Sequence, residues 1–331
     1  MKRLIEKFPQ QLMAALELGQ SAALRNSDTN LLQVVVAGMG GSGIGGNLIE
    51  AFTANELTVP LLITKSYELP FYVNEHTLFL ACSYSGNTEE TVQALQAAIR
   101  QRAHIVCICS GGEIMSIAKK HDLDIIEIPG HDKSPRANIG YAFTQILFTL
   151  YYHGLISNLF IKELAQAAQL IEQEQESILK EAKTIADCFT HQFPIIYSDA
   201  KLFPVAVRFQ QQINENSKQL CHVNAFPEMN HNELVGWELS QEIYKHAVVA
   251  FFKTDFDHAR VRLRMDICKK LFQEKVKNVI NIQAKGTSFI QQNIYLIHLT
   301  DWVSYFLAEN NKVDPFPVKI IDFLKAELLK K

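Results

Sequence analysis

The sequence has no long run of uncharged apolar residues, although hydrophobic residues make up 48% of its 331 positions. A membrane-spanning helix needs about 20 such residues in succession, so no membrane segment is expected. The first stretch, "MKRLIEKFPQQLMAALELG", is interrupted by Glu6, Lys7 and Pro9 and does not resemble a secretory signal peptide. With 32 basic and 35 acidic residues, the charge gives no reason to expect a nucleic acid or an anionic membrane as partner.

The sequence also lacks any Cys-x-x-Cys pair among its 6 cysteines. Most of them lie in apolar stretches, where cysteine behaves as a small hydrophobic residue. This distribution favours a reducing, cytoplasmic location over a disulfide framework.

The first half alternates short apolar segments with helical patterns, notably at 89–102 and 112–121. The apolar segments are rich in β-branched residues and apolar on both faces, which is typical of buried parallel strands. They lie at 32–39, 60–66, 77–85, 103–110 and 123–130. This alternation predicts an α/β domain with a doubly wound sheet.

A long amphipathic pattern over 156–190 predicts a single connecting helix. The α/β rhythm then returns, with strands expected at 193–198, 246–253 and 278–283 and helices at about 256–274 and 290–309. We therefore expect two doubly wound parallel-sheet subdomains with flanking helices. Their predicted ranges are 1–155 and 191–331, joined by 156–190.

A glycine-rich loop follows the first predicted strand, in "VVVAGMGGSGIGG". It matches G-x-G-x-x-G in two registers, so this match alone has low specificity. A dinucleotide site usually has an acidic residue at the end of the second strand, where this chain has Lys65 and Ser66. Lys65 could favour an extra phosphate, which leaves NADP open, whereas no Gly-Lys-Ser/Thr occurs to form a Walker loop. Tight strand–helix packing is the structural alternative.

A second loop, "ACSYSGNTEET" at 81–91, opens another predicted helix. Ser83, Ser85 and Thr88 place hydroxyl groups at the start of this helix, where free N–H groups and the helix dipole attract a phosphate. Asn87 or Thr88 is expected to cap the helix. An ordinary capped turn is the alternative, but two such loops on neighbouring strands favour a phosphate site.

Together these motifs resemble the sugar isomerase (SIS) fold, and more specifically the bifunctional phosphoglucose/phosphomannose isomerases. The resemblance extends over nearly the whole chain and includes four further segments: "SPRANIGYAF" (134–143), "QQQINENSK" (210–218), "PEMNHNELVGWE" (227–238) and "VDPFPVKIIDFLK" (313–325). It implies an aldose–ketose isomerase acting on glucose 6-phosphate and fructose 6-phosphate. Mannose 6-phosphate is left open, because the family's threonine near the C-terminal lysine has no counterpart in 313–325.

The resemblance also implies a role for each candidate residue. Glu215 would be the base that moves the proton, and His231 would open the sugar ring in the neighbouring subunit's site of a homodimer. Arg136 would stabilise the enediolate, and Lys325, with Lys319 as a rival, would assist at the ring oxygen. The sugar phosphate would bind at five positions in the two loops: Gly41, Ser42, Ser83, Ser85 and Thr88.

Isomerisation through a cis-enediol requires a base, a ring-opening group and a cation near the oxyanion, so no metal or cofactor is expected. Two other functions remain open from the residues. One is a non-catalytic phosphosugar sensor, which would need the serine loops but no acid–base set. The other is a nicotinamide-dependent oxidoreductase, against which the missing acidic residue counts.

Overall fold

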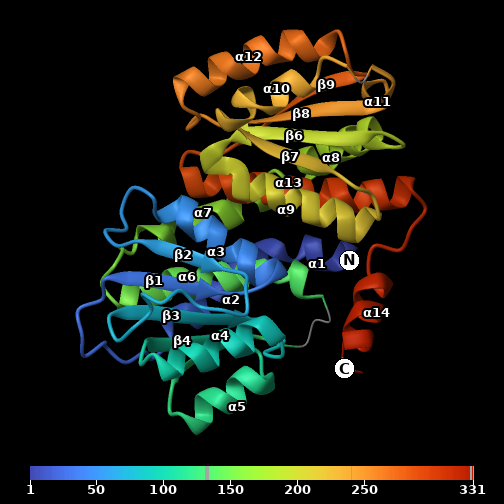
Figure 1. The fold of residues 1–331 in the computed structure, drawn as a ribbon. Helices are drawn as coiled ribbons and strands as arrows, with labels where there is room; N and C mark the ends of the chain where they lie inside the picture. Colours follow the sequence, from blue (N-terminus) through green and yellow to red (C-terminus); the bar gives the residue numbers. More distant parts are fainter. Residues whose placement is uncertain (131–133, 240, 329, 331) are drawn as a thin grey trace. The chain divides into compact units, whose positions relative to one another are not determined.

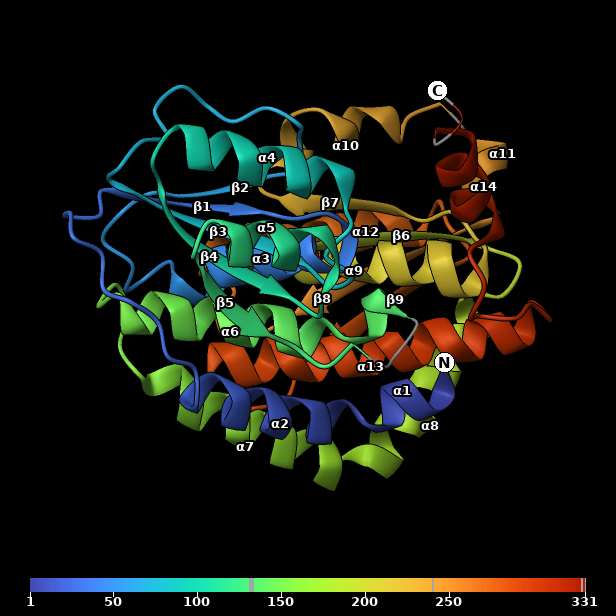
Figure 2. The same ribbon diagram turned by 90° about the horizontal axis from the view of Figure 1, so that it is seen from below.

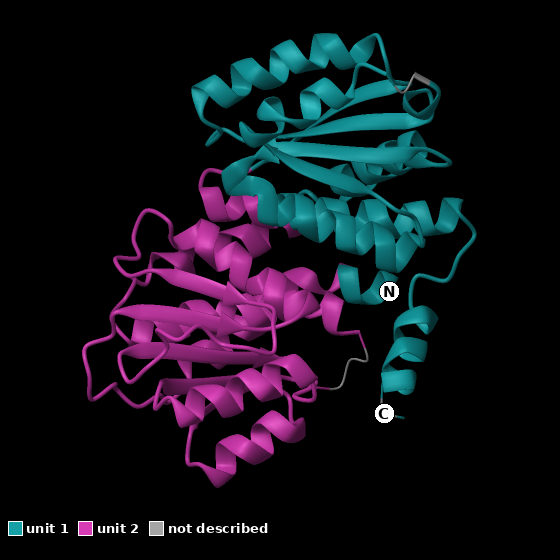
Figure 3. Cartoon of the chain, viewed as in Figure 1, with its two compact units in different colours: residues 1–5, 173–285, 295–331 teal, residues 6–172, 286–294 magenta. Residues whose placement is uncertain are grey.

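The computed structural model describes residues 1–130, 134–239, 241–328 and 330. The chain forms two compact units, which Figure 3 distinguishes by colour. Unit 1 contains residues 1–5, 173–285 and 295–331, and unit 2 contains residues 6–172 and 286–294.

Unit 2 is built around a five-stranded sheet in the order β2-β1-β3-β4-β5, with every neighbouring pair parallel. The strands are β1 (Gln33–Ala37), β2 (Leu61–Thr64), β3 (Thr77–Ser83), β4 (His104–Cys109) and β5 (Asp124–Glu127). β3 is buried along its whole length, as the apolar segment at 77–85 predicts. The chain reverses direction across the sheet between β1 and β3, which makes their carboxyl ends a topological switch point.

Helices cover both faces of this sheet (Figures 1 and 2). α4 (Glu89–Arg100) and α5 (Gly112–Lys120) share a core with β1, β3 and β4 on one face. α3 (Gly40–Thr53) packs against α6 (Ile139–Tyr152), and α6 packs against α2 (Phe8–Gln20). The 3-10 turn η1 (Pro135–Ala137) leads into α6, and α7 (Leu159–Gln173) follows it.

Unit 1 repeats this pattern with four parallel strands in the order β7-β6-β8-β9. They are β6 (Phe193–Asp199), β7 (His222–Phe226), β8 (Ala247–Lys253) and β9 (Asn278–Gln283). The helices that lie wholly or mostly in this unit are α1 (Lys2–Glu6), α8 (Gln175–Phe189), α9 (Phe203–Gln212), α10 (Glu233–Gly236), α11 (Gln241–Tyr244), α12 (Ala259–Gln273), α13 (Phe289–Asn310) and α14 (Lys319–Leu328), with short turns η2 (Ala200–Leu202), η3 (Ile213–Ser217) and η4 (Glu228–His231). The predicted fold class, two parallel α/β halves with flanking helices, is confirmed.

Two elements differ from the sequence expectation. The predicted single helix over 156–190 is two helices, α7 and α8, because Glu174 leaves helical geometry at φ −87° and ψ 6°. The Glu- and Gln-rich sequence there has no Gly or Pro to mark the break. The strand β7 lacks a clear apolar pattern and was not predicted from the sequence.

The compact units also differ from the predicted ranges 1–155 and 191–331. The N-terminal residues 1–5 belong to unit 1, and residues 286–294 return to unit 2. α13 therefore begins in one unit and continues in the other. Among the described residues, no helix has the length and apolar character needed to cross a membrane.

Candidate active site

The glycine loop lies between the end of β1 and α3, at the switch point of unit 2. α3 begins at Gly40, and the N–H groups of Ser42 and Gly43 already donate to the Met39 carbonyl, so within its first turn the N–H groups of Gly40 and Gly41 precede the intrahelical hydrogen-bond ladder. A Cβ at Gly43 would lie 2.5 Å from the carbonyl oxygen of Gly38, so this glycine is required for packing. A Cβ at Gly41 would instead lie 3.4 Å from the carbonyl oxygen of Pro135, beside η1. The packing interpretation thus applies to Gly43, and the phosphate-binding role expected of Gly41 stays a prediction.

The serine loop follows β3, the strand paired with β1. The hydroxyls of Ser83 and Thr88 lie 2.8 Å apart, and the Gly86 N–H donates to Ser83 Oγ at 3.1 Å. The expected capping is wrong in detail: Thr88 is at the N-cap position of α4, but its side chain forms no capping hydrogen bond. Its hydroxyl is directed to Ser83 instead, and the Asn87 side chain accepts from the Glu113 N–H at 2.9 Å. The start of α4 therefore lacks a side-chain cap from Thr88.

A third loop, after β4, supports the serine loop and was missed in the sequence analysis. Ser110 Oγ donates to the carbonyl of Tyr84 at 2.6 Å, and the Ile114 N–H donates to the carbonyl of Gly86 at 2.9 Å. This third loop has the sequence "CSGG", a glycine-containing turn after an apolar strand. The same sequence signal marks the first two loops.

Arg136 lies in η1 and is buried, with 7% of its surface exposed. The backbone of its turn is next to Gly41, so Arg136 and the glycine loop meet at one place although 95 positions separate them. A buried guanidinium is a strong, permanently charged partner for oxyanions. Unit 2 therefore brings Arg136 and the five predicted phosphate-binding residues to the same edge of its sheet.

Lys65 replaces the acidic residue of dinucleotide sites and contacts the same loop. Its ammonium donates to Asn47 Oδ1 at 2.6 Å, and its Cε would lie 3.0 Å from a Cβ at Gly43. Burial lowers the pKa of Lys65. The hydrogen bond to Asn47 thus holds the Lys65 side chain against α3.

Glu215 lies in the π-helical turn η3 that follows α9 in unit 1. Such turns are rare and frequently occur at functional sites. Its neighbours are buried and bonded to α13: Asn216 Nδ2 donates to Ser304 Oγ at 2.9 Å, and Ser217 Oγ donates to the Ser304 carbonyl at 2.7 Å. Glu215 is half-buried between these anchors and the exposed Asn214.

A buried ion pair fixes the helix that leads to Glu215. Arg208 on α9 contacts Asp301 on α13 at 2.7 Å, and Gln212 Nε2 donates to the same carboxylate at 2.9 Å. Lys218, after the π turn, donates to the carbonyls of Glu215 and Pro317. The residues that follow Glu215 in "INENSK" therefore fix the π turn on which Glu215 lies.

The remaining predicted residues of unit 1 lie at its surface. His231, at the end of η4, is exposed. Lys325 and its rival Lys319 are exposed on α14, a helix with no buried residue among those described. No group of three or more His, Cys, Asp or Glu side chains suited to a metal occurs in the described parts of the chain.

Comparison with known proteins places this chain in a family. A family model, the bacterial phospho-glucose isomerase C-terminal SIS domain, matches residues 178–328. A bifunctional phosphoglucose/phosphomannose isomerase of Caldicellulosiruptor bescii is 37% identical, covering 98% of this chain and 97% of that protein. Its counterpart in Aquifex aeolicus is 36% identical over 90% of each chain. This chain belongs to the bifunctional phosphoglucose/phosphomannose isomerase family.

A solved structure shares the fold of this chain. The C-terminal domain of glucosamine-fructose-6-phosphate aminotransferase from Francisella tularensis aligns with a TM-score of 0.73 at 14% identity. The alignment covers 95% of this chain and 97% of that structure. At this level of identity the comparison supports the SIS fold alone.

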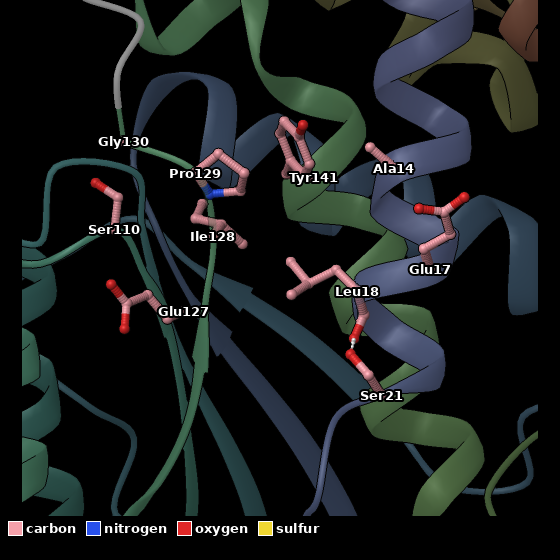
Figure 4. Close-up of a pocket in the computed structure, with 10 residues that line it drawn as sticks. All are labelled: Ala14, Glu17, Leu18, Ser21, Ser110, Glu127, Ile128, Pro129, Gly130 and Tyr141. Atoms are coloured by element: carbon pink, nitrogen blue, oxygen red, sulfur yellow. Dashed lines mark hydrogen bonds between the residues drawn. The ribbon is translucent and has the colours of Figure 1, made fainter.

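A cavity of about 630 Å³ in unit 2 lies apart from the predicted residues (Figure 4). It is bounded by α2, the segment after β5 and the first turn of α6, where Tyr141 lies. Its described lining carries the carboxyl groups of Glu17 and Glu127, which would repel a phosphate dianion. We therefore do not assign the phosphate of this family's substrates to it.

Proposed function

We propose that this chain interconverts glucose 6-phosphate and fructose 6-phosphate through a cis-enediol intermediate. The observation that carries the proposal is the approach of the Arg136 turn to the glycine loop at the switch point of unit 2. Backbone N–H groups and the hydroxyls of Ser42, Ser83, Ser85 and Thr88 would hold the phosphate, and Arg136 would face the developing oxyanion. The names of the family members support this substrate class.

In the proposed mechanism, His231 first transfers a proton that opens the sugar ring, assisted by Lys325 at the ring oxygen. The carboxylate of Glu215 then takes the proton from C2 of the aldose, which leaves an enediolate whose charge Arg136 stabilises. Once the hydroxyl proton has passed from O2 to O1 of the enediolate, the same carboxyl group returns its proton to C1, which yields the ketose. The reaction transfers no electrons to an external acceptor, so it requires no redox cofactor.

We also propose that the protein works as a homodimer in the cytoplasm, at the branch shared by glycolysis and gluconeogenesis. The exposure of His231 suits a residue that enters the site of a neighbouring subunit. The six cysteines are all unpaired, which suits a reducing compartment.

A coupled assay tests the activity. Fructose 6-phosphate conversion would be followed with added glucose-6-phosphate dehydrogenase, in the wild type and in Glu215→Gln. We expect wild-type turnover and a loss of about 10²–10⁴-fold in kcat for the variant, the usual contribution of a general base. Absence of wild-type turnover would reject the isomerase activity, whereas undiminished turnover by Glu215→Gln would reject only the assignment of Glu215 as the base. The same assay with mannose 6-phosphate, and with phosphoglucose isomerase as a further coupling enzyme, decides whether mannose 6-phosphate is also a substrate.

Mixing two inactive variants tests the shared site. In a dimer with exchanged histidines, a hybrid of Glu215→Gln and His231→Gln subunits contains one site with both native groups. We expect activity to reappear after the two variants are unfolded together and refolded, but not when each is refolded alone. No recovery in a preparation shown to contain hybrid dimers would reject the exchange.

The alternative is a non-catalytic phosphosugar-binding protein. Such a protein would bind fructose 6-phosphate without converting it. It is not favoured, because the relatives that match most of this chain are named as isomerases.

A further inference from the structure

The turn that carries His231 is anchored on one side by α12. Asn230 Oδ1 accepts a hydrogen bond from Arg264 Nη1 at 3.0 Å, and Asn230 Nδ2 donates to Cys268 Sγ at 3.4 Å. His231 itself is exposed. Its direction therefore depends on how its neighbours in the chain are held.

On its other side, the turn is anchored by Glu233, the first residue of α10. Its carboxylate accepts from Tyr197 Oη at 2.5 Å and lies 2.9 and 3.0 Å from His222 Nε2, and it also accepts from Asn224 Nδ2. These donors come from two neighbouring strands, β6 and β7. Trp237 Nε1 donates to Tyr197 Oη at 3.2 Å and extends the network into the core of unit 1.

The carboxylate of Glu233 is well suited to anchoring the turn that carries His231. Burial raises the pKa of Glu233, but the hydrogen bonds from His222, Asn224 and Tyr197 outweigh it, and the pKa is lowered overall. Glu233 is therefore ionised at neutral pH, and hydrogen bonds to an ionised acceptor are stronger than neutral ones. Breaking this network would release the turn, whereas the buried strand residues of β6 and β8 would keep their core.

We propose that Glu233 is the positioning residue of His231, holding the histidine at the angle that ring opening requires. This inference rests on the proposed function of His231. Because reacting groups must be placed within a fraction of an ångström, a displacement of about 1 Å can reduce the rate by about 10²-fold.

The test compares Glu233→Gln with Glu228→Gln, a carboxamide substitution in the same turn. Glu228 accepts a hydrogen bond from Asn232 at the surface, and both residues lie outside the strands. The amide of Glu233→Gln turns one acceptor oxygen into a donor that faces other donors. We expect kcat on fructose 6-phosphate to fall about 10–100-fold in Glu233→Gln and to stay within about twofold in Glu228→Gln.

A linear inhibitor separates positioning from a merely structural role. An open-chain aldonic acid phosphate needs no ring opening, so its inhibition constant should be unchanged in Glu233→Gln while kcat falls. The kinetic isotope effect with glucose 6-phosphate deuterated at C2 should decrease, as it should in His231→Gln, because ring opening then limits the rate. Weakened binding of the linear inhibitor, an increased isotope effect, or unchanged kcat would each overturn the proposal.

His231→Gln makes the two levels of inference distinguishable. Full turnover by His231→Gln would reject the proposed role of the histidine and that of Glu233 with it. Loss of turnover by His231→Gln together with normal turnover by Glu233→Gln would reject only the positioning role. If Glu233→Gln does not fold, Tyr197→Phe removes one donor and keeps the ring, and it should show a smaller loss of the same kind.

Discussion

The two units have the same strand pattern but present different chemistry. Unit 2 offers backbone N–H groups, hydroxyls and one buried guanidinium at the switch point of its sheet. Unit 1 offers ionisable groups, Glu215 and His231, on turns held by hydrogen bonds that are buried for the first and part-buried for the second. In the proposed mechanism, one unit would bind the phosphate and the other would transfer the protons. Substitutions in unit 2 should then mainly change KM, and those in unit 1 kcat.

Arg136 should break this division, and its substitution should have the largest effect. It lies in the binding unit, but its proposed contact with the enediolate forms in the transition state. We expect Arg136→Gln to reduce kcat by about 10²–10³-fold, the usual loss for one oxyanion donor.

The coupled assay measures kcat and KM separately for this variant, and Arg102→Gln is the control. Arg102 is an exposed arginine of the same unit and should behave as the wild type. A change confined to KM would show that Arg136 binds the phosphate only.

Acid should affect the stability of unit 1 more than that of unit 2. Burial lowers the pKa of His298 to about 3, so the folded unit holds it neutral while the unfolded chain takes up a proton below its ordinary value of 6.5. Stability is therefore complete above pH 6.5 and falls as the pH drops toward 3, by about 1.4 kcal/mol per pH unit, or about 2 kcal/mol between pH 6.5 and 5. In the variant His298→Gln, the free energy of unfolding should depend less steeply on pH.

Tryptophan fluorescence during urea unfolding measures this effect, because both tryptophans, Trp237 and Trp302, lie in unit 1. His104 of unit 2 is the matched control. Its pKa is also lowered, by burial and by His153, but it is only half-buried. If His104→Gln flattened the pH dependence of the free energy of unfolding as much as His298→Gln, the expected difference in acid sensitivity between the units would be contradicted.

Ser83→Ala should have the smallest effect and the simplest interpretation. Ser83 is buried beside Thr88, and its proposed bond to the phosphate is the same in substrate and transition state. We expect KM for fructose 6-phosphate to rise about tenfold, or about 1.4 kcal/mol, with kcat unchanged.

Inhibition by inorganic phosphate should weaken in parallel with KM in Ser83→Ala. Ser116→Ala, which removes a hydroxyl bonded within α5, should leave both constants unchanged. A loss of kcat in Ser83→Ala would place this hydroxyl in the chemistry rather than in binding.

Local patterns were sufficient to predict most of the fold. The strands at 77–85, 193–198 and 278–283 were recognisable because buried parallel strands are short, apolar and bounded by turn residues. The break at Glu174 and the strand β7 were not recognisable, because no Gly or Pro marks the break and no clear apolar pattern marks the strand.

The sequence by itself determined the two α/β halves, the glycine and serine loops and the family to which they point, because each depends on neighbouring residues. Only the tertiary structure decided that the Arg136 turn meets Gly41, that Thr88 bonds to Ser83 instead of capping α4, and that residues 286–294 belong to unit 2. It also joined Glu233 to Tyr197, His222 and Asn224. These features depend on which segments pack together, and no local spacing encodes that.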